Sequence, residues 1–112
     1  METIGENLWR DLNIITIKTN LENFVPKATL DYKRVLEVFE AIETAATPLK
    51  NLDALQFLKD DFSLMSKIVL KLPVDDQRQY TQYITSEAVK ADASSRWDKF
   101  WKWIVGLHES AV

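Results

Sequence analysis

The sequence predicts an all-α fold, a compact bundle of five or six helices formed by a single helical domain over residues 1–112. Apolar residues recur at steps of three and four positions along most of the chain, which is the spacing of one helix face. Only three prolines occur, Pro26, Pro48 and Pro73, and they divide the chain into four segments. Because proline is excluded from helix interiors but tolerated between helices, these positions are expected to separate helices.

The first segment, residues 1–25, gives the weakest helical signal. Leu8, Leu12 and Ile15 recur at helical spacing, but Ile15 also belongs to a β-branched run that would suit a short strand. We expect a helix over residues 4–23. The sequence leaves open whether this segment packs on the rest of the chain.

The second helix is expected over residues 29–46. Thr29 suits the N-cap, because a threonine hydroxyl can accept a hydrogen bond from a backbone N–H of the first turn. Val35, Phe39 and Ile42 follow at steps of four and three residues and form an apolar face, and glutamates occupy the opposite side.

Residues 48–72 are expected to hold either two short helices or one bent helix. Asp60 and Asp61 would start the second helix in the first alternative, because aspartate favours helix N-termini through capping and through the helix dipole. Leu72 ends the segment, since a residue before proline disfavours the helical conformation.

Two further helices complete the expected bundle. Asp75 is expected to cap a helix that carries Tyr80. The small and polar residues 90–94 predict a loop. Ser94 or Ser95 is then expected to cap the closing helix.

The composition excludes several kinds of chemistry. The chain has no cysteine, one histidine and two widely separated glycines, which rules out disulfides, thiol nucleophiles, cysteine-ligated zinc and glycine-rich phosphate loops. A net charge of −3 disfavours nucleic-acid binding through phosphate contacts. No apolar run approaches the ~20 residues of a membrane helix, and the first residues lack the features of a signal peptide. We expect no cofactor, no metal, no membrane contact, and an intracellular, by default cytoplasmic, location.

The residues that catalysis would need have structural interpretations instead. The carboxylate pairs at 60–61 and 75–76 do not converge, because adjacent helical residues point about 100° apart. His108 lies near the end of the closing helix, where a histidine commonly contacts the last carbonyls. Ser63 and Ser86 have no histidine at a fixed spacing that would indicate a triad. The sequence therefore predicts a protein without enzymatic activity.

The closing helix is apolar over too wide an arc for one packed face. Its apolar residues cover roughly 200° of the circumference, whereas packing on a bundle needs little more than ~100°. These residues are Trp97, Phe100, Trp101, Trp103, Ile104, Val105 and Leu107. Two explanations stay open. Either the helix is central in the bundle and covered on two sides, or part of the arc contacts another chain, with Trp103 and Leu107 as its most exposed part.

The features that follow the first segment occur in a specific order. They are a helix at 32–42, a leucine-rich connector at 49–55, a helical segment ending in Lys71-Leu72-Pro73, a helix with Tyr80, Tyr83 and Ile84, and the aromatic segment 96–104. This order resembles the Gag polyprotein region of retrotransposons, especially the Pao/BEL type, in which a helix ends in a Lys-Leu-Pro motif and a later helix has an aromatic face. The resemblance implies a self-associating, capsid-like helical domain at 29–112, in a piece of such a polyprotein or in a host protein derived from one.

The resemblance and the wide apolar arc together predict a non-enzymatic protein–protein interaction module. It is expected to self-associate, by dimerisation or capsid-like assembly, through the aromatic closing helix. The expected interface residues are Trp97, Trp101, Trp103 and Leu107, some of which must instead belong to the core. The alternative is a helical adaptor whose hydrophobic groove accepts an amphipathic helical peptide of another protein.

Overall fold

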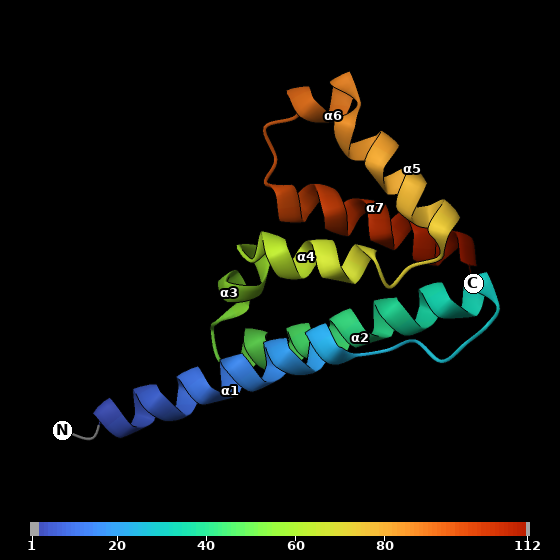
Figure 1. Ribbon diagram of the computed structural model, residues 1–112. Coiled ribbons are helices and arrows are strands. Elements are labelled where there is room, and N and C mark those ends of the chain that lie inside the picture. The colour runs from blue at the N-terminus through green and yellow to red at the C-terminus, as the bar shows by residue number, and fades with distance from the viewer. Residues whose placement is uncertain (1–2, 112) are drawn as a thin grey trace.

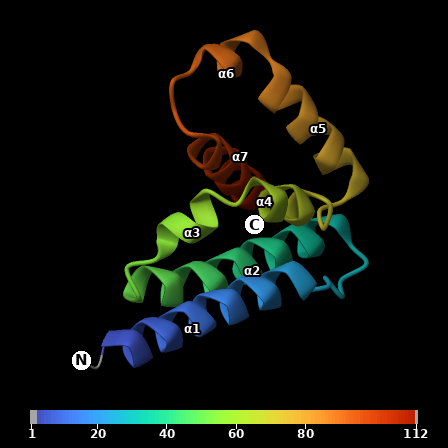
Figure 2. The ribbon, with the colours of Figure 1, turned by 60° about the vertical axis from the view of Figure 1, so that its left-hand side comes forward.

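The computed structural model describes residues 3–111, with side chains from Leu8 onward, and confirms the all-α prediction (Figure 1). The described residues form seven helices rather than five or six: α1 (Thr3–Asn23), α2 (Asp31–Asn51), α3 (Leu55–Lys59), α4 (Phe62–Val69), α5 (Val74–Thr85), α6 (Glu87–Ala91) and α7 (Arg96–Ala111). The two long helices α1 and α2 lie side by side and antiparallel, and both Figure 1 and Figure 2 show the remaining helices above them.

The hydrophobic core surrounds α2, which contacts α1, α3 and α7. Ile42 and Leu49 of α2, Ile68 of α4, and Phe100 and Ile104 of α7 have no exposed surface. Because these side chains come from three helices far apart in the sequence, the core joins the whole described chain into one bundle.

Pro48 lies inside α2 and not between helices, so the predicted end of this helix at residue 46 is wrong. Proline lacks an N–H, and it therefore leaves the carbonyl of Thr44, four residues earlier, without its helical donor. Thr44 is exposed, so water can satisfy that carbonyl. The helix continues for three residues after Pro48 and ends near Leu52, whose N–H donates to the Pro48 carbonyl (3.0 Å).

The predicted Thr29 cap is also wrong. The N-cap position of α2 belongs to Leu30, which makes no capping hydrogen bond through its side chain. The loop before the helix is instead held by Glu37, whose carboxylate accepts hydrogen bonds from the backbone N–H groups of Lys27 (3.1 Å) and Ala28 (2.9 Å).

The segment between Pro48 and Pro73 forms two helices, α3 and α4. Asp61 caps α4 as expected, because its carboxylate accepts a hydrogen bond from the Leu64 N–H (2.9 Å). Asp75 does not cap α5, whose N-cap is Pro73. It lies in the first turn, where the helix dipole still favours a negative charge.

A break at Ser86 accounts for the helix that the sequence did not predict. Ser86 is extended, and its hydroxyl donates to the Tyr83 carbonyl (2.8 Å) and accepts from the Val89 N–H (3.4 Å). The chain therefore leaves α5 and starts α6 at the same residue. The loop predicted at 90–94 is wrong in its first two residues, which belong to α6. Ser95 caps α7 as expected by accepting from the Asp98 N–H (3.1 Å).

Polar side chains fix the orientation of α1 on the bundle. The Lys71 ammonium donates to the carbonyls of Glu22 (2.6 Å) and Phe24 (2.8 Å) at the carboxyl end of α1. The Arg10 guanidinium donates to the carbonyls of Leu52 (3.2 Å) and Asp53 (3.1 Å) after α2. These contacts settle that the first segment packs on the rest of the chain.

The bundle is elongated because α1 projects from it. The radius of gyration is 15.5 Å, compared with about 13 Å for a compact chain of this length. Figure 1 shows the amino-terminal half of α1 extending past the other helices at the lower left. Only the carboxyl-terminal half of α1 therefore lies against both α2 and α4.

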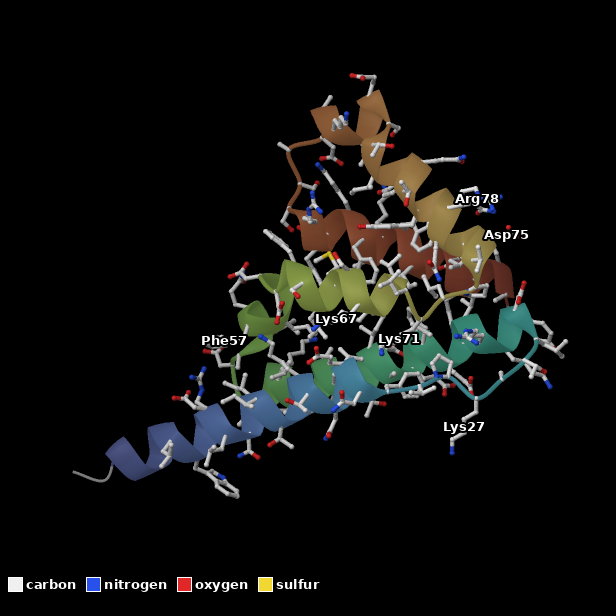
Figure 3. All side chains as sticks on the ribbon, viewed as in Figure 1. Lys27, Phe57, Lys67, Lys71, Asp75 and Arg78 are labelled. Carbon is white, nitrogen blue, oxygen red and sulfur yellow. The ribbon has the colours of Figure 1, made fainter. Side chains whose placement is uncertain are left out.

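We predict that Lys71→Met destabilises the fold by roughly 1–2 kcal/mol, because the Glu22 carbonyl of α1 and the Phe24 carbonyl just after it lose a charged donor. The matched control is Lys67→Met, since Lys67 makes only an exposed ion pair with Glu22 and should change stability by less than about 0.5 kcal/mol. Both lysines are labelled in Figure 3. Urea denaturation measures the two values, and equal effects would contradict the assigned role of Lys71.

Candidate functional site

Most of the apolar arc of α7 is covered by the chain itself. Trp97 is only 6% exposed, and its ring stacks on that of Trp101 with centroids 5.9 Å apart. Trp101 in turn stacks on Phe39 of α2 at 5.3 Å. Because α7 contacts α2 on one side and α5 on another, a central position in the bundle accounts for these residues.

Trp103 and Leu107 lie on a different side of α7, at a groove toward α5 and α6. The groove has a volume of about 460 Å³, and its lining includes Tyr83, Val89 and Gly106. The Trp103 ring meets Tyr80 edge to face at 5.0 Å, so one side of it packs within the chain. Trp103 and Leu107 are both half-buried, as is Trp101, so of the four predicted interface residues only Trp97 is buried.

Gly106 keeps this groove open. A Cβ atom at this position would meet no heavy atom within 4 Å, so a larger side chain would project into free space.

His108 and Asp61 make contacts within the fold. His108 stacks on Phe39 with ring centroids 4.0 Å apart. A hydrogen bond from Lys18 and the Leu64 N–H lower the pKa of Asp61. Burial raises the pKa of Asp76, with a further contribution from the nearby Asp31 and Asp75 carboxylates. Among the residues that the structure describes, no group of three or more histidines and carboxylates is placed to hold a metal ion.

An exposed apolar surface lies on α1, where sequence reasoning did not place a site. Leu8, Leu12 and Ile15 are 58%, 50% and 59% exposed, and Trp9 beside them is 68% exposed. These four residues are named the α1 stripe below. The face of α1 that packs on the bundle carries Ile14 instead, which is 5% exposed. The helix therefore has two apolar faces and only one is covered.

The signal for the α1 stripe was present in the sequence. Leu8, Leu12 and Ile15 are spaced by four and three residues, whereas the buried residues Ile14 and Leu21 are spaced by seven. At about 100° per residue the mean directions of the two sets differ by about 140° around the helix, so they cannot share one face. Only the positions of α2 and α4 determine which of the two sets is buried.

Two further aromatic side chains are exposed on α3 and α4. Phe57 of α3 and Phe62 of α4 are each about half exposed and line a cleft with Lys18. An arginine covers one face of each ring, with Arg10 5.9 Å from the Phe57 centroid and Arg96 5.6 Å from that of Phe62. Figure 3 shows Phe57 at the outer edge of α3, near the projecting half of α1.

A separate groove of about 490 Å³ runs between α1 and α2. Its apolar lining comes from Ile17, Leu21, Phe24, Ala41 and Ala45, and Glu37 and Glu40 contribute carboxylates. The alanines of α2 make room here, because their side chains end at Cβ. This groove is the feature that corresponds to the expected peptide-binding alternative.

No protein-family model, curated protein or solved structure matches the chain, so the candidate surfaces rest on the geometry described above. In the described part of the chain, no helix combines the length and the apolar character that crossing a membrane requires.

We predict that Gly106→Ala raises the stability of the fold by about 0.5–1 kcal/mol, since glycine in a helix interior costs that much relative to alanine and the added methyl group meets no atom. Urea denaturation gives the change. A loss of stability would show that the groove beside Gly106 is closed in solution.

Proposed function

We propose that this chain is a non-enzymatic protein–protein interaction module that self-associates, with the α1 stripe as its main contact. The exposure of Leu8, Trp9, Leu12 and Ile15 on one projecting helix carries the proposal. Soluble proteins rarely leave large side chains of this kind together on their surface, and contiguous apolar patches mark interaction sites.

Other exposed apolar residues lie at the opposite end of the bundle. Val25, Leu30 and Tyr32 belong to the loop before α2 and its first turn, and Leu70 and Val74 flank the turn between α4 and α5, which Lys71 joins to the Phe24 carbonyl. The α1 stripe differs because its four residues lie within about two helical turns and project away from the core.

The proposal retains Trp103 and Leu107 as a second contact, beside the groove of α7. One two-fold contact closes as a dimer, whereas a second, separate contact allows dimers to join into larger assemblies. Tryptophan is among the residues that most often supply the binding energy of an interface.

Capsid-like assembly is the form of self-association that the Gag resemblance favours. The motif that carries the resemblance has defined structural roles in this chain. Lys71 holds the end of α1, Leu72 is buried in the core, and Pro73 starts α5. We propose that the chain is related to the Gag region of Pao/BEL-type retrotransposons, or to a host protein derived from one.

The second candidate function is a helical adaptor that binds a peptide of another protein. The groove between α1 and α2 favours it, because an apolar floor flanked by Glu37 and Glu40 suits an amphipathic segment that carries basic residues. An adaptor of this kind would remain monomeric alone and would bind its partner as a monomer.

We predict that the wild-type chain has a mass in solution above that of one chain and that this mass rises with concentration. Leu12→Glu places a charge in the α1 stripe and should weaken self-association roughly tenfold or more. Light scattering at two concentrations measures the mass of the wild-type chain and of the Leu12→Glu variant. The matched control is Leu70→Glu, because Leu70 is 67% exposed outside the α1 stripe and its substitution should leave the mass unchanged.

A wild-type chain that stays monomeric at high micromolar concentration would overturn the self-association proposal and favour the adaptor. If Leu12→Glu and Leu70→Glu had the same effect, the α1 stripe would lose its assigned role.

The second contact has its own test. We predict that Gly106→Arg prevents association beyond the dimer, because the arginine occupies the groove beside Trp103 and Leu107. Gly106→Ala keeps the helix and leaves most of the groove open, so it serves as the control. Sedimentation velocity resolves the species, and an unchanged distribution for Gly106→Arg would exclude the groove as a contact.

A further inference from the structure

Three residues of the α1 stripe, together with Thr19, have the spacing of a helix–helix seam. Leu8, Leu12, Ile15 and Thr19 follow at steps of four, three and four residues, and all four are exposed. This is the alternation of a and d positions in a coiled coil, in which each side chain inserts between side chains of the facing helix. A second helix is therefore the partner shape that the α1 stripe fits.

The residues beside the seam are charged on one side only. Asp11 and Lys18 are seven residues apart and occupy equivalent positions along this side. Trp9 and Thr16, also seven residues apart, occupy the other side. The Thr16 hydroxyl donates to the Leu12 carbonyl of its own helix (2.8 Å), which satisfies its polar atom and leaves its methyl group for apolar contact.

We infer that the partner of the α1 stripe is the α1 helix of a second copy, packed antiparallel about a two-fold axis. This inference rests on the proposed self-association and specifies its geometry. Leu12 faces Ile15 of the partner subunit, and Leu8 faces Thr19 of the partner subunit. Both pairs repeat on the other side of the axis, as a two-fold contact requires.

Charge complementarity supports the antiparallel direction. In this register Asp11 lies beside Lys18 of the partner subunit, with an axial offset of about 3 Å at ~1.5 Å of rise per residue. The same pair forms twice. The Lys18 ammonium already contacts Asp61 of its own chain (2.8 Å), and its three N–H donors allow it to bridge both carboxylates.

The uncharged residues beside the seam also face a suitable neighbour in this register. Trp9 lies beside Thr16 of the partner subunit, again with an axial offset of about 3 Å. The exposed Trp9 ring therefore covers the methyl group of this threonine and not a charged group.

The charge of the chain disfavours a lipid surface as the partner of the α1 stripe. Helices that lie on anionic membranes carry lysine and arginine on their polar face. The net charge of this chain is −3, and Asp11 borders the α1 stripe. The seam from Leu8 to Thr19 spans about three helical turns, about 17 Å at ~1.5 Å per residue, and we expect so short a contact to form a weak dimer.

Cysteine crosslinking tests the direction and the register, because the natural sequence contains no cysteine. The double variant Leu8→Cys with Thr19→Cys is treated with a short thiol crosslinker below and above the concentration at which the mass rises. We expect covalent dimers in at least tenfold excess over those of Leu8→Cys alone. In the antiparallel register the two cysteines at position 8 lie about 16 Å apart along the axis.

The matched control is Leu8→Cys with Asn20→Cys. Asn20 is exposed but lies about 100° around the helix from Thr19, so it should not crosslink. Efficient dimers from Leu8→Cys alone would show parallel helices and overturn the inference. A wild-type chain that associates while neither Leu8→Cys nor the Leu8→Cys/Thr19→Cys pair crosslinks would place the contact elsewhere and overturn the inference, but not the self-association. A monomeric wild-type chain would overturn both.

Discussion

The position of α2 between α1 and α7 is the constraint on which the rest of the structure depends. This helix carries six buried residues, from Val35 to Leu49, on one apolar face about 120° wide. One side contacts α1, and another contacts α7 and α3. Both α1 and the aromatic residues of α7 therefore depend on α2 for most of the apolar surface that they pack against. The tolerance of Pro48 within this helix has the same origin, because packing of the flanking turns outweighs one missing hydrogen bond.

The central position of α2 limits what can cover α1. Because α1 lies at the edge of the bundle, α2 and α4 cover only the side that carries Ile14 and Leu21. The side that carries Leu8, Leu12 and Ile15 stays exposed, and α4 borders it only at a cleft beside Ile15 and Thr19. The position of α1 at the edge of the bundle therefore explains both how it packs on α2 and why the α1 stripe, on which the proposed function rests, is exposed.

Polar contacts determine which side of α1 is turned outward. Arg10 and Lys71 donate to main-chain carbonyls, and Lys18 pairs with Asp61, so α1 is attached along most of its length. Rotating α1 to bury Leu12 would break these contacts and expose Ile14. A polar network of this kind contributes orientation as much as stability, and it makes the exposure of the α1 stripe a fixed property of the fold.

The sequence alone determined the all-α class, the helix starts at Asp60 or Asp61 and at Ser94 or Ser95, and the absence of cysteine chemistry, because these depend on local spacing and residue type. It left a short strand open for the first segment. It could not place the end of α2 or the break at Ser86, since packing overrides the local preferences of proline and serine. Only the tertiary structure decided which apolar faces are covered. The wide arc of α7 proved to be largely internal, whereas α1, whose pattern looked ordinary, keeps one apolar face exposed. Periodicity along a helix reports that a face is apolar, but the identity of its neighbour depends on contacts between residues far apart in the chain.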